Sequence, residues 1–202
     1  MNINISQIKI PYDKLLARLG YLKLHTKIDK KTEILIKENL GAAQKLIQPK
    51  AVLAFENIST AENIISFENG FKIQSAGVAK LFQNCFKAYG IAVTIGATIE
   101  NRRNDYLTEK ETFKALIFDA AGSVAAEEAV SAAYEQIKKI EAENNNIVTK
   151  RYSPGYGDWA IESQKDFLEW LGASHIGISL NKAFLMRPEK SVSAIIGVKA
   201  YP

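Results

Sequence analysis

The fold depends most on one stretch, residues 108–130, which reads T-E-K-E-T-F-K-A-L-I-F-D-A-A-G-S-V-A-A-E-E-A-V. Thr108 and Glu111 have the spacing of a helix capping box, so we expect the longest helix of the chain to begin near Thr108. An apolar stripe follows at helical spacing: Phe113, Leu116, Ile117, Ala120 and Val124. The centre of this helix, 120–126, consists almost entirely of small residues. Such residues allow either tight packing against a sheet or the close approach of a flat ligand.

Short apolar runs on both sides of this helix predict the strands of a sheet. They occupy residues 51–55, 63–67, 71–73, 91–95, 147–152, 176–180 and 192–198. An E-N-G sequence at 68–70 separates two of them, as the turn of a hairpin does. Further helices are expected from Ser75, a capping residue, to about Phe86, and over 164–171. The spacing is too irregular for a βαβ series, so the predicted fold class is α+β: a single domain whose mixed, mainly antiparallel sheet packs against long helices.

Two shorter helices are expected before the first strand. One spans residues 11–19. The other begins at the N-cap residue Asp29 and stops before Pro49, with apolar residues at helical spacing between these positions. We therefore expect an N-terminal helical segment, 1–50, packed on a main domain, 51–202.

The composition is that of an ordinary globular protein: 202 residues, of which 47% are apolar and 24% charged, with a net charge of +4. The basic residues are dispersed and lack interleaved aromatic residues, so no nucleic-acid partner is expected. No apolar run approaches the roughly 18 residues needed to cross a bilayer, and the N-terminus does not resemble a secretion signal. We therefore expect no membrane partner, and the predicted location is the cytoplasm.

Cysteine and histidine are too few for disulfides and for the common metal sites. Cys85 is the only cysteine, which excludes an internal disulfide and a four-cysteine metal site. We expect Cys85 to be a small buried hydrophobic residue. The two histidines, His25 and His175, stand alone, so no resident metal is expected. The sequence also lacks a glycine-rich Rossmann turn and a P-loop.

A second stretch, residues 151–158, reads R-Y-S-P-G-Y-G-D and contains the candidate binding residues. Its proline restricts the backbone, and its two glycines permit a tight turn that brings main-chain atoms close to a ligand. Arg151 presents a planar fork that can hold a carboxylate through two hydrogen bonds. Tyr156 adds an aromatic face and a hydroxyl group. On spacing alone, the same residues also fit a plain strand-to-helix turn with an ion-paired arginine.

The sequence R-Y-S-P-G-Y-G-D-W at 151–159 closely resembles the R-x-x-P-G-Y motif in the activation domain of cobalamin-dependent methionine synthase. Other segments resemble the short, free-standing members of that family, and they occur in the same order. They are L-A-R-L-G-Y (16–21), I-G-A-T (95–98), D-A-A-G-S-V-A-A-E-E-A (119–129), H-I-G-I-S-L (175–180) and M-R-P-E-K-S-V-S-A-I-I-G-V (186–198). The resemblance spans most of the chain and is most specific over 151–198.

The resemblance implies a module that reactivates an oxidised cobalamin enzyme. Such a domain binds S-adenosylmethionine over the cobalamin face, a flavodoxin or ferredoxin-like protein supplies one electron, and the methyl group then passes to the reduced cobalt. This sequence lacks D-x-H-x-x-G, the motif that supplies a histidine ligand to cobalt. Cobalamin is therefore expected on a partner, the cobalamin-binding domain of a methionine synthase or a related corrinoid protein. The alternative is a module that binds S-adenosylmethionine, or docks to a corrinoid protein, without supporting methyl transfer.

The resemblance also implies roles for individual residues. Arg151 would hold the carboxylate of S-adenosylmethionine, and Tyr156 would lie near the methyl group as the catalytic residue. Backbone around Gly155 and Gly157 would contact the nucleoside or methionine part of the ligand. Glu128 would meet the cationic end of the ligand. Glu127 is the alternative, because the two side chains project about 100° apart and only one can point inward.

Two features depart from the family's pattern. Its full-length members carry an acidic residue in an N-terminal helix that contacts the ligand, and the nearest candidates in this sequence are Glu38 and Asn39. Those members also continue past the last strand with a tyrosine-bearing segment, whereas this sequence ends at Pro202. Both features bear on how firmly one side of the pocket holds the ligand.

Overall fold

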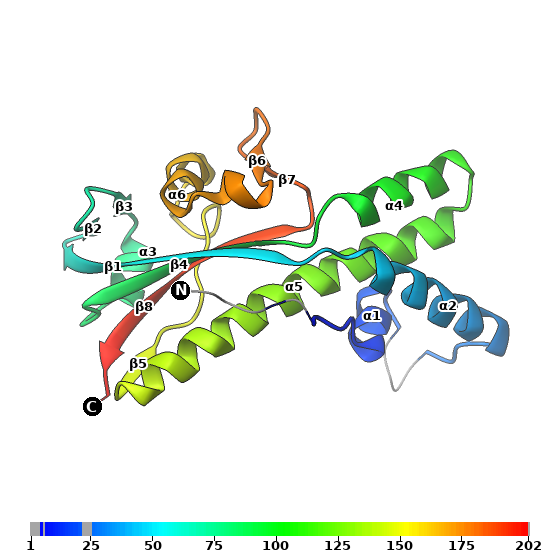
Figure 1. Ribbon diagram of the computed structural model, residues 1–202, viewed down its shortest axis with the longest axis horizontal. Helices are drawn as coiled ribbons and strands as arrows, with labels where there is room; N and C mark the ends of the chain where they lie inside the picture. The colour runs from blue at the N-terminus through cyan, green and yellow to red at the C-terminus, as the bar shows by residue number, and fades with distance from the viewer. Residues whose placement is uncertain (1–4, 6, 22–25, 202) are drawn as a thin grey trace.

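A six-stranded sheet lies at the centre of the computed structural model, which describes residues 5, 7–21 and 26–201 (Figure 1). Its strands are β1 (Lys50–Ala61), β2 (Ile64–Phe67), β3 (Lys72–Gln74), β4 (Lys87–Thr94), β5 (Asn146–Val148) and β8 (Ser191–Ala200). The strand order is β3-β2-β1-β4-β8-β5, and every neighbouring pair is antiparallel. The predicted α+β class with a mainly antiparallel sheet is therefore confirmed.

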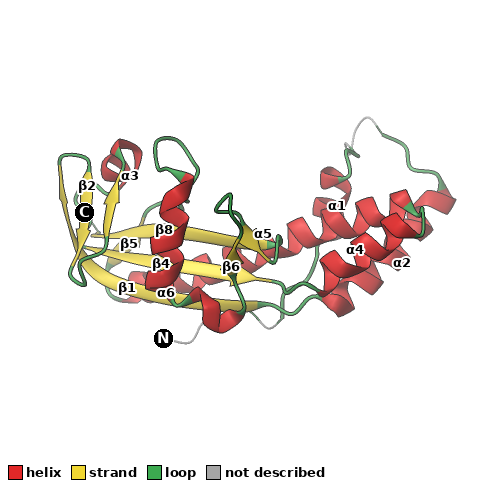
Figure 2. Cartoon of the chain, turned by 90° about the horizontal axis from the view of Figure 1, so that it is seen from above, coloured by secondary structure: helices red, strands yellow, loops and turns green. Residues whose placement is uncertain are grey.

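Helices pack on both faces of this sheet and extend beyond one end of it. They are α1 (Tyr12–Arg18), α2 (Lys30–Leu46), α3 (Ala76–Leu81), α4 (Thr98–Thr108), α5 (Thr112–Glu143) and α6 (Gln164–Leu171). Figure 2 shows α1, α2 and α4 gathered around one end of α5, whereas α3 and α6 lie with the sheet. In the described part of the chain, no helix combines the length and apolar character needed to span a bilayer.

Strand β4 shows how the sheet separates two apolar layers. Tyr89, Ile91 and Val93 are buried in the layer that contains α5, whereas Ala88 and Ala92 face the layer of α3 and α6. This alternation is the two-residue period of a strand. A Cβ atom at the intervening Gly90 would lie 2.3 Å from the ring of Trp170, so glycine allows α6 to lie directly on the sheet.

The N-terminal helices share the core of the long helix α5. Leu15 of α1 and Ile36 and Ala43 of α2 are fully buried in the same cluster as the alanines of α5. The small residues at 120–126 serve this close packing, since most of them are buried between α5 and its neighbours. The division of the chain at residue 50 stays a prediction.

Several predicted boundaries agree with the structure. Asp29 caps α2 by accepting a hydrogen bond from the Thr32 amide at 3.0 Å. Ser75 likewise accepts from the Val78 amide, also at 3.0 Å, and so caps α3. Helix α6 has the predicted bounds, and the hairpin of β2 and β3 turns at 68–70.

The predicted start of the long helix is wrong. Thr108 lies at the end of α4, a helix that the sequence analysis did not identify. Lys110 takes a positive φ of 63° and turns the chain, and α5 then begins after Glu111, whose side chain makes no capping hydrogen bond. Helix α4 was missed because its surface is mostly polar and lacks an apolar stripe. It nevertheless packs on α5, with Tyr106 against Phe118 at 5.1 Å between ring centroids.

Three other elements are shorter than predicted. Helix α3 ends at Leu81 rather than near Phe86. Beyond β5, only a single bridge between Tyr152 and Ile195 continues the pairing expected over 147–152. Within 176–180, only β6 (Ser179–Leu180) is a strand, because the preceding Ala173–Ile176 winds into a 3-10 helix. Strand β6 pairs with β7 (Met186–Arg187) to form a separate hairpin.

Candidate functional site

A cavity of about 650 Å³ opens beside the 151–158 stretch. Its remaining walls come from α5, the start of α6, the β6–β7 hairpin and the first residues of β8. This volume lies within the range of about 300–1,000 Å³ that small-molecule sites usually occupy. The lining includes Glu127, Arg151, Tyr156, Gln164, Leu185 and Ser193.

Arg151 and Glu127 face each other at this cavity. The Nη2 atom of Arg151 lies 3.3 Å from Oε2 of Glu127, and the two side chains are 29% and 60% exposed. A contact of this length between water-accessible groups contributes little to stability. A ligand can therefore displace this contact at little cost. Its carboxylate would then pair with the guanidinium of Arg151, and its ammonium group with the carboxylate of Glu127.

Glu128 points to a different part of the molecule. It accepts a hydrogen bond from Nζ of Lys14, on α1, at 2.5 Å, and it is not part of the cavity lining. The resemblance implies Glu128 for the cationic end of the ligand, with Glu127 as the alternative. In the structure the cavity position belongs to Glu127, as expected if only one of two successive helical residues can point inward.

The two glycines of the 151–158 stretch shape the turn. Gly155 and Gly157 have φ angles of 87° and 54°, a region that side chains disfavour. A Cβ atom at position 157 would lie 2.2 Å from the hydroxyl oxygen of Tyr152, so a side chain there would also have to displace this hydroxyl group. Neither glycine lines the cavity, whereas Tyr156 between them does and is 69% exposed. The turn thus places an aromatic ring at the mouth of the cavity.

Asp158 fastens this turn to α3. Its carboxylate accepts hydrogen bonds from Ser75 Oγ at 2.6 Å and from the amides of Ala76 at 2.6 Å and Gly77 at 3.1 Å. The Ser75 hydrogen bond, followed by those from the two amides, lowers the pKa of Asp158. The carboxylate therefore stays ionised to a lower pH than that of an ordinary aspartate.

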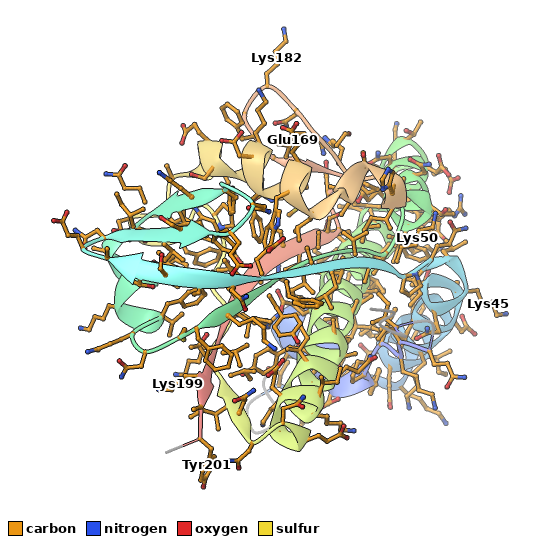
Figure 3. The ribbon with its side chains drawn as sticks, turned by 60° about the vertical axis from the view of Figure 1, so that its left-hand side comes forward. Lys45, Lys50, Glu169, Lys182, Lys199 and Tyr201 are labelled. Atoms are coloured by element: carbon orange, nitrogen blue, oxygen red, sulfur yellow. The ribbon has the colours of Figure 1, made fainter. Side chains whose placement is uncertain are left out.

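The β6–β7 hairpin contributes Phe184, Leu185 and Met186 to the cavity lining. Figure 3 shows Lys182 at its tip, pointing away from the rest of the molecule. At the base of the hairpin, after β7, Glu189 pairs with Arg103 of α4 and Lys190 pairs with Asp119 of α5.

Lys190 is the central residue of that base. Its Nζ atom donates to Asp119 Oδ1 at 2.8 Å and to Ser123 Oγ at 2.9 Å. Arg103 of α4 bridges Asp119 at 3.0 Å and Glu189 at 2.9 Å. Burial tends to raise the pKa of Asp119, but the hydrogen bonds from Lys190 and Arg103 outweigh it, and the pKa is lowered. The wall is thus anchored by ionised groups.

The other residues singled out in the sequence lie away from the cavity. Asn39 is buried on α2 and donates to the carbonyl of Leu35, and Glu38 beside it is exposed; neither lines the cavity. His175 is exposed, and His25 lies outside the described residues. Over residues 5, 7–21 and 26–201, no cluster of three His, Cys, Asp or Glu side chains is placed to hold a metal ion.

Cys85 is buried, as predicted, at 8% exposure. Burial raises the pKa of its thiol to about 11, with Lys199 acting weakly in the opposite direction. The thiol is therefore protonated at neutral pH and has the character of a small apolar side chain.

No protein-family model matches the sequence, and no curated protein matches it. Among solved structures, the chain is similar to "Crystal Structure of the MetH Reactivation Domain bound to AdoHcy", with a TM-score of 0.66. The two chains are 15% identical, and the match covers 92% of this chain and 69% of that chain. The chain has the reactivation-domain fold. This agrees with the fold that the 151–159 motif and the accompanying segments implied.

Part of the cavity lining within this fold carries no signal in the sequence. Gln164 and Ser193 line it and are each 2% exposed, and the hairpin residues at 184–186 form a whole wall. A single glutamine at the start of an amphipathic helix carries no signal that distinguishes it from an ordinary surface residue. The hairpin was obscured because its strands are only two residues long.

Proposed function

We propose that this chain binds S-adenosylmethionine in the cavity beside Arg151 and serves as a stand-alone reactivation module. Its task would be to support the reductive methylation of cob(II)alamin carried by a partner, the cobalamin-binding domain of a methionine synthase. The proposal depends on the agreement of two independent findings. The stretch chosen from sequence alone lines the cavity, and the chain has the fold of a domain whose structure is described as bound to AdoHcy.

The residues of the cavity fit an amino-acid nucleoside. Arg151 offers a planar donor pair to a carboxylate, and Glu127 offers an acceptor to an ammonium group. Their mutual contact is 3.3 Å long and water-accessible, so a zwitterionic ligand can replace it without leaving a buried charge unpaired. The glycines at 155 and 157 would contribute by keeping the turn in place rather than by touching the ligand directly.

Tyr156 is the residue that we place nearest to the reacting methyl group. Its ring stands at the cavity mouth and is 69% exposed, where a partner can approach it. S-adenosylmethionine supplies an activated methyl group, and the chain's own contribution is to hold and orient it. Orientation of this kind can account for a large part of a rate enhancement. A flavodoxin or ferredoxin-like protein of the cytoplasm would supply the electron.

Calorimetry tests the binding step. The wild-type chain should bind S-adenosylmethionine, and Arg151→Ala should weaken binding by about tenfold or more, because losing a charged hydrogen-bonded contact costs roughly 1.5–3 kcal/mol. Arg102→Ala is the matched control, since Arg102 lies on α4 and pairs with Asp105 and Glu109 away from the cavity. An affinity unaffected by Arg151→Ala would remove Arg151 from the proposed site.

Spectroscopy tests the catalytic step. A methionine synthase truncated before its own activation domain is mixed with this chain, S-adenosylmethionine and a low-potential electron donor. The cob(II)alamin spectrum should convert to that of methylcobalamin only when this chain is present. Binding without any such conversion would favour the alternative function, a binding or docking module for a corrinoid protein that does not support transfer.

A further inference from the structure

Three of the most buried residues in the cavity lining carry no charge. Gln164, the first residue of α6, is 2% exposed and lines the cavity together with Ser193, also 2% exposed, and Ala194, 1% exposed. We call these three residues the floor. The Nε2 atom of Gln164 donates to Ser193 Oγ at 2.7 Å, which ties α6 to β8 at this point.

The amide oxygen of Gln164 has no hydrogen-bond donor among residues 5, 7–21 and 26–201. The oxygen is not among the fully enclosed polar atoms that lack a partner, so it keeps accessible surface, and Gln164 lines the cavity. A ligand in the cavity can therefore reach it, and a ligand that offers no donor there would leave it unpaired at a cost in free energy. The bond to Ser193 fixes the amide, so its oxygen is held in place before any ligand arrives. Such preorganisation reduces the entropy lost on binding. The floor therefore presents one fixed acceptor.

Charge is distributed unevenly over the same cavity. Glu127 and Arg151 are 60% and 29% exposed, and Lys150 is also exposed, so the ionisable lining residues all reach water. The apolar side chains of Ile161 and Val192 also line the cavity. Because burying an unpaired charge is far more costly than burying a neutral ring, the charged end of a ligand should stay at the rim and its uncharged end should enter the floor.

We propose that the Gln164 amide oxygen accepts a hydrogen bond from the exocyclic amine of adenine, which makes Gln164 the residue that selects an adenosyl ligand. This inference rests on the proposed function, since it assumes that the ligand's amino-acid end lies at Arg151. A flat base with one amine at its edge matches a single acceptor flanked by apolar walls.

Calorimetry with two ligands tests the inference. One ligand is S-adenosylhomocysteine, and the other is the same compound with purine in place of adenine, which lacks only the 6-amino group. The wild-type chain should bind the purine compound about tenfold more weakly, since one buried acceptor then loses its partner. Gln164→Met should bind both compounds alike, because this variant removes the acceptor at similar volume. Gln74→Met, on the exposed edge of β3, is the control and should keep the tenfold ratio.

The possible outcomes distinguish a failure of this inference from a failure of the proposed function. Equal binding of both ligands by the wild-type chain overturns the role of Gln164 and leaves the proposed function standing. Binding of neither ligand overturns both. Retention of the tenfold ratio in Gln164→Met assigns selection to another residue and overturns the inference. If that variant fails to fold, Gln164→Asn, which withdraws the oxygen by one methylene, should reduce the ratio in the same direction.

Discussion

The long helix α5 carries two carboxylates in opposite situations. Glu141, near its C-terminal end, is 1% exposed. It accepts hydrogen bonds from Tyr89 Oη at 2.5 Å, Lys87 Nζ at 2.6 Å and Asn146 Nδ2 at 2.8 Å. Glu127, at the cavity, is 60% exposed and makes one polar side-chain contact within the described part of the chain, 3.3 Å from Arg151. One acid is saturated with partners from the fold, and the other has almost none.

This difference distinguishes an acid that maintains the fold from one available to a ligand. The partners of Glu141 come from β4 and β5, so the carboxylate joins α5 to two strands of the sheet. Exchanging them for a ligand would leave several buried groups unsatisfied. Glu127 can change partner at little cost because water already reaches it. Removing Glu141 should therefore lower the free energy of unfolding, whereas removing Glu127 should lower the affinity for the ligand.

The largest effect is expected from Glu141→Ala. Losing the buried carboxylate leaves Lys87, which is only 18% exposed, and Tyr89 without their acceptor. We expect the free energy of unfolding to fall by about 3 kcal/mol, measured by urea denaturation. Glu143→Ala, at an exposed position of the same helix end, should change it by less than about 0.5 kcal/mol. Similar losses in the two variants would show that the contacts of Glu141 do not stabilise the fold.

The pH dependence of the free energy of unfolding should show the contribution of the Glu141 carboxylate. Burial tends to raise the pKa of Glu141, but hydrogen bonds from Lys87, Tyr89 and Asn146 outweigh it, so the folded-state pKa is lowered. A lowered pKa means that the stabilisation is complete above the unfolded value of about 4.3 and is lost as the pH falls towards the folded value. Glu141→Gln should therefore lose stability less steeply than the wild-type chain below about pH 5.

Comparing the wild-type chain with Glu141→Gln isolates the contribution of the Glu141 carboxyl group. Other carboxyls with lowered pKa, among them Asp119 and Asp158, titrate in the same range and contribute equally to both curves. The difference between the curves then belongs to position 141. Parallel curves for Glu141→Gln and the wild-type chain would contradict the lowered pKa of Glu141.

Much of the fold could be predicted because its signals are local. Capping residues such as Asp29 and Ser75 accept a hydrogen bond from the amide three residues further on, so they mark the start of a helix locally. The E-N-G sequence marks the turn of its hairpin in the same way. Helix α4 could not be found in this way. It is stabilised by packing on α5 and by contacts such as the one from Glu100, which accepts from the Lys190 amide at 2.7 Å across 90 residues of chain. The hydrophobic periodicity of a sequence carries no information on contacts between residues so far apart in the chain.

The site was predictable only along its continuous part. Residues 151–158 could be chosen because the chemistry and the turn lie in one stretch. The choice between Glu127 and Glu128 depends on the rotation of α5 about its axis, which is set by its packing on the sheet and on α1. Gln164 lines the cavity because α6 packs on the sheet, with Trp170 against Gly90 and the Gln164 amide bonded to Ser193 of β8. Tertiary contacts, rather than residue type, decide these positions.

The smallest expected effect concerns those two neighbouring glutamates and is measured on the ligand. Glu127→Gln should leave the free energy of unfolding within about 0.5 kcal/mol of the wild-type value, because its one contact is long and water-accessible. Its affinity for S-adenosylhomocysteine should nevertheless fall about fivefold, since the ammonium group loses a charged acceptor. Glu128→Gln changes the same chemical group one position along the helix, and it weakens only the contact with Lys14. That variant should retain full affinity, and the reverse pattern would transfer the ligand contact from Glu127 to Glu128.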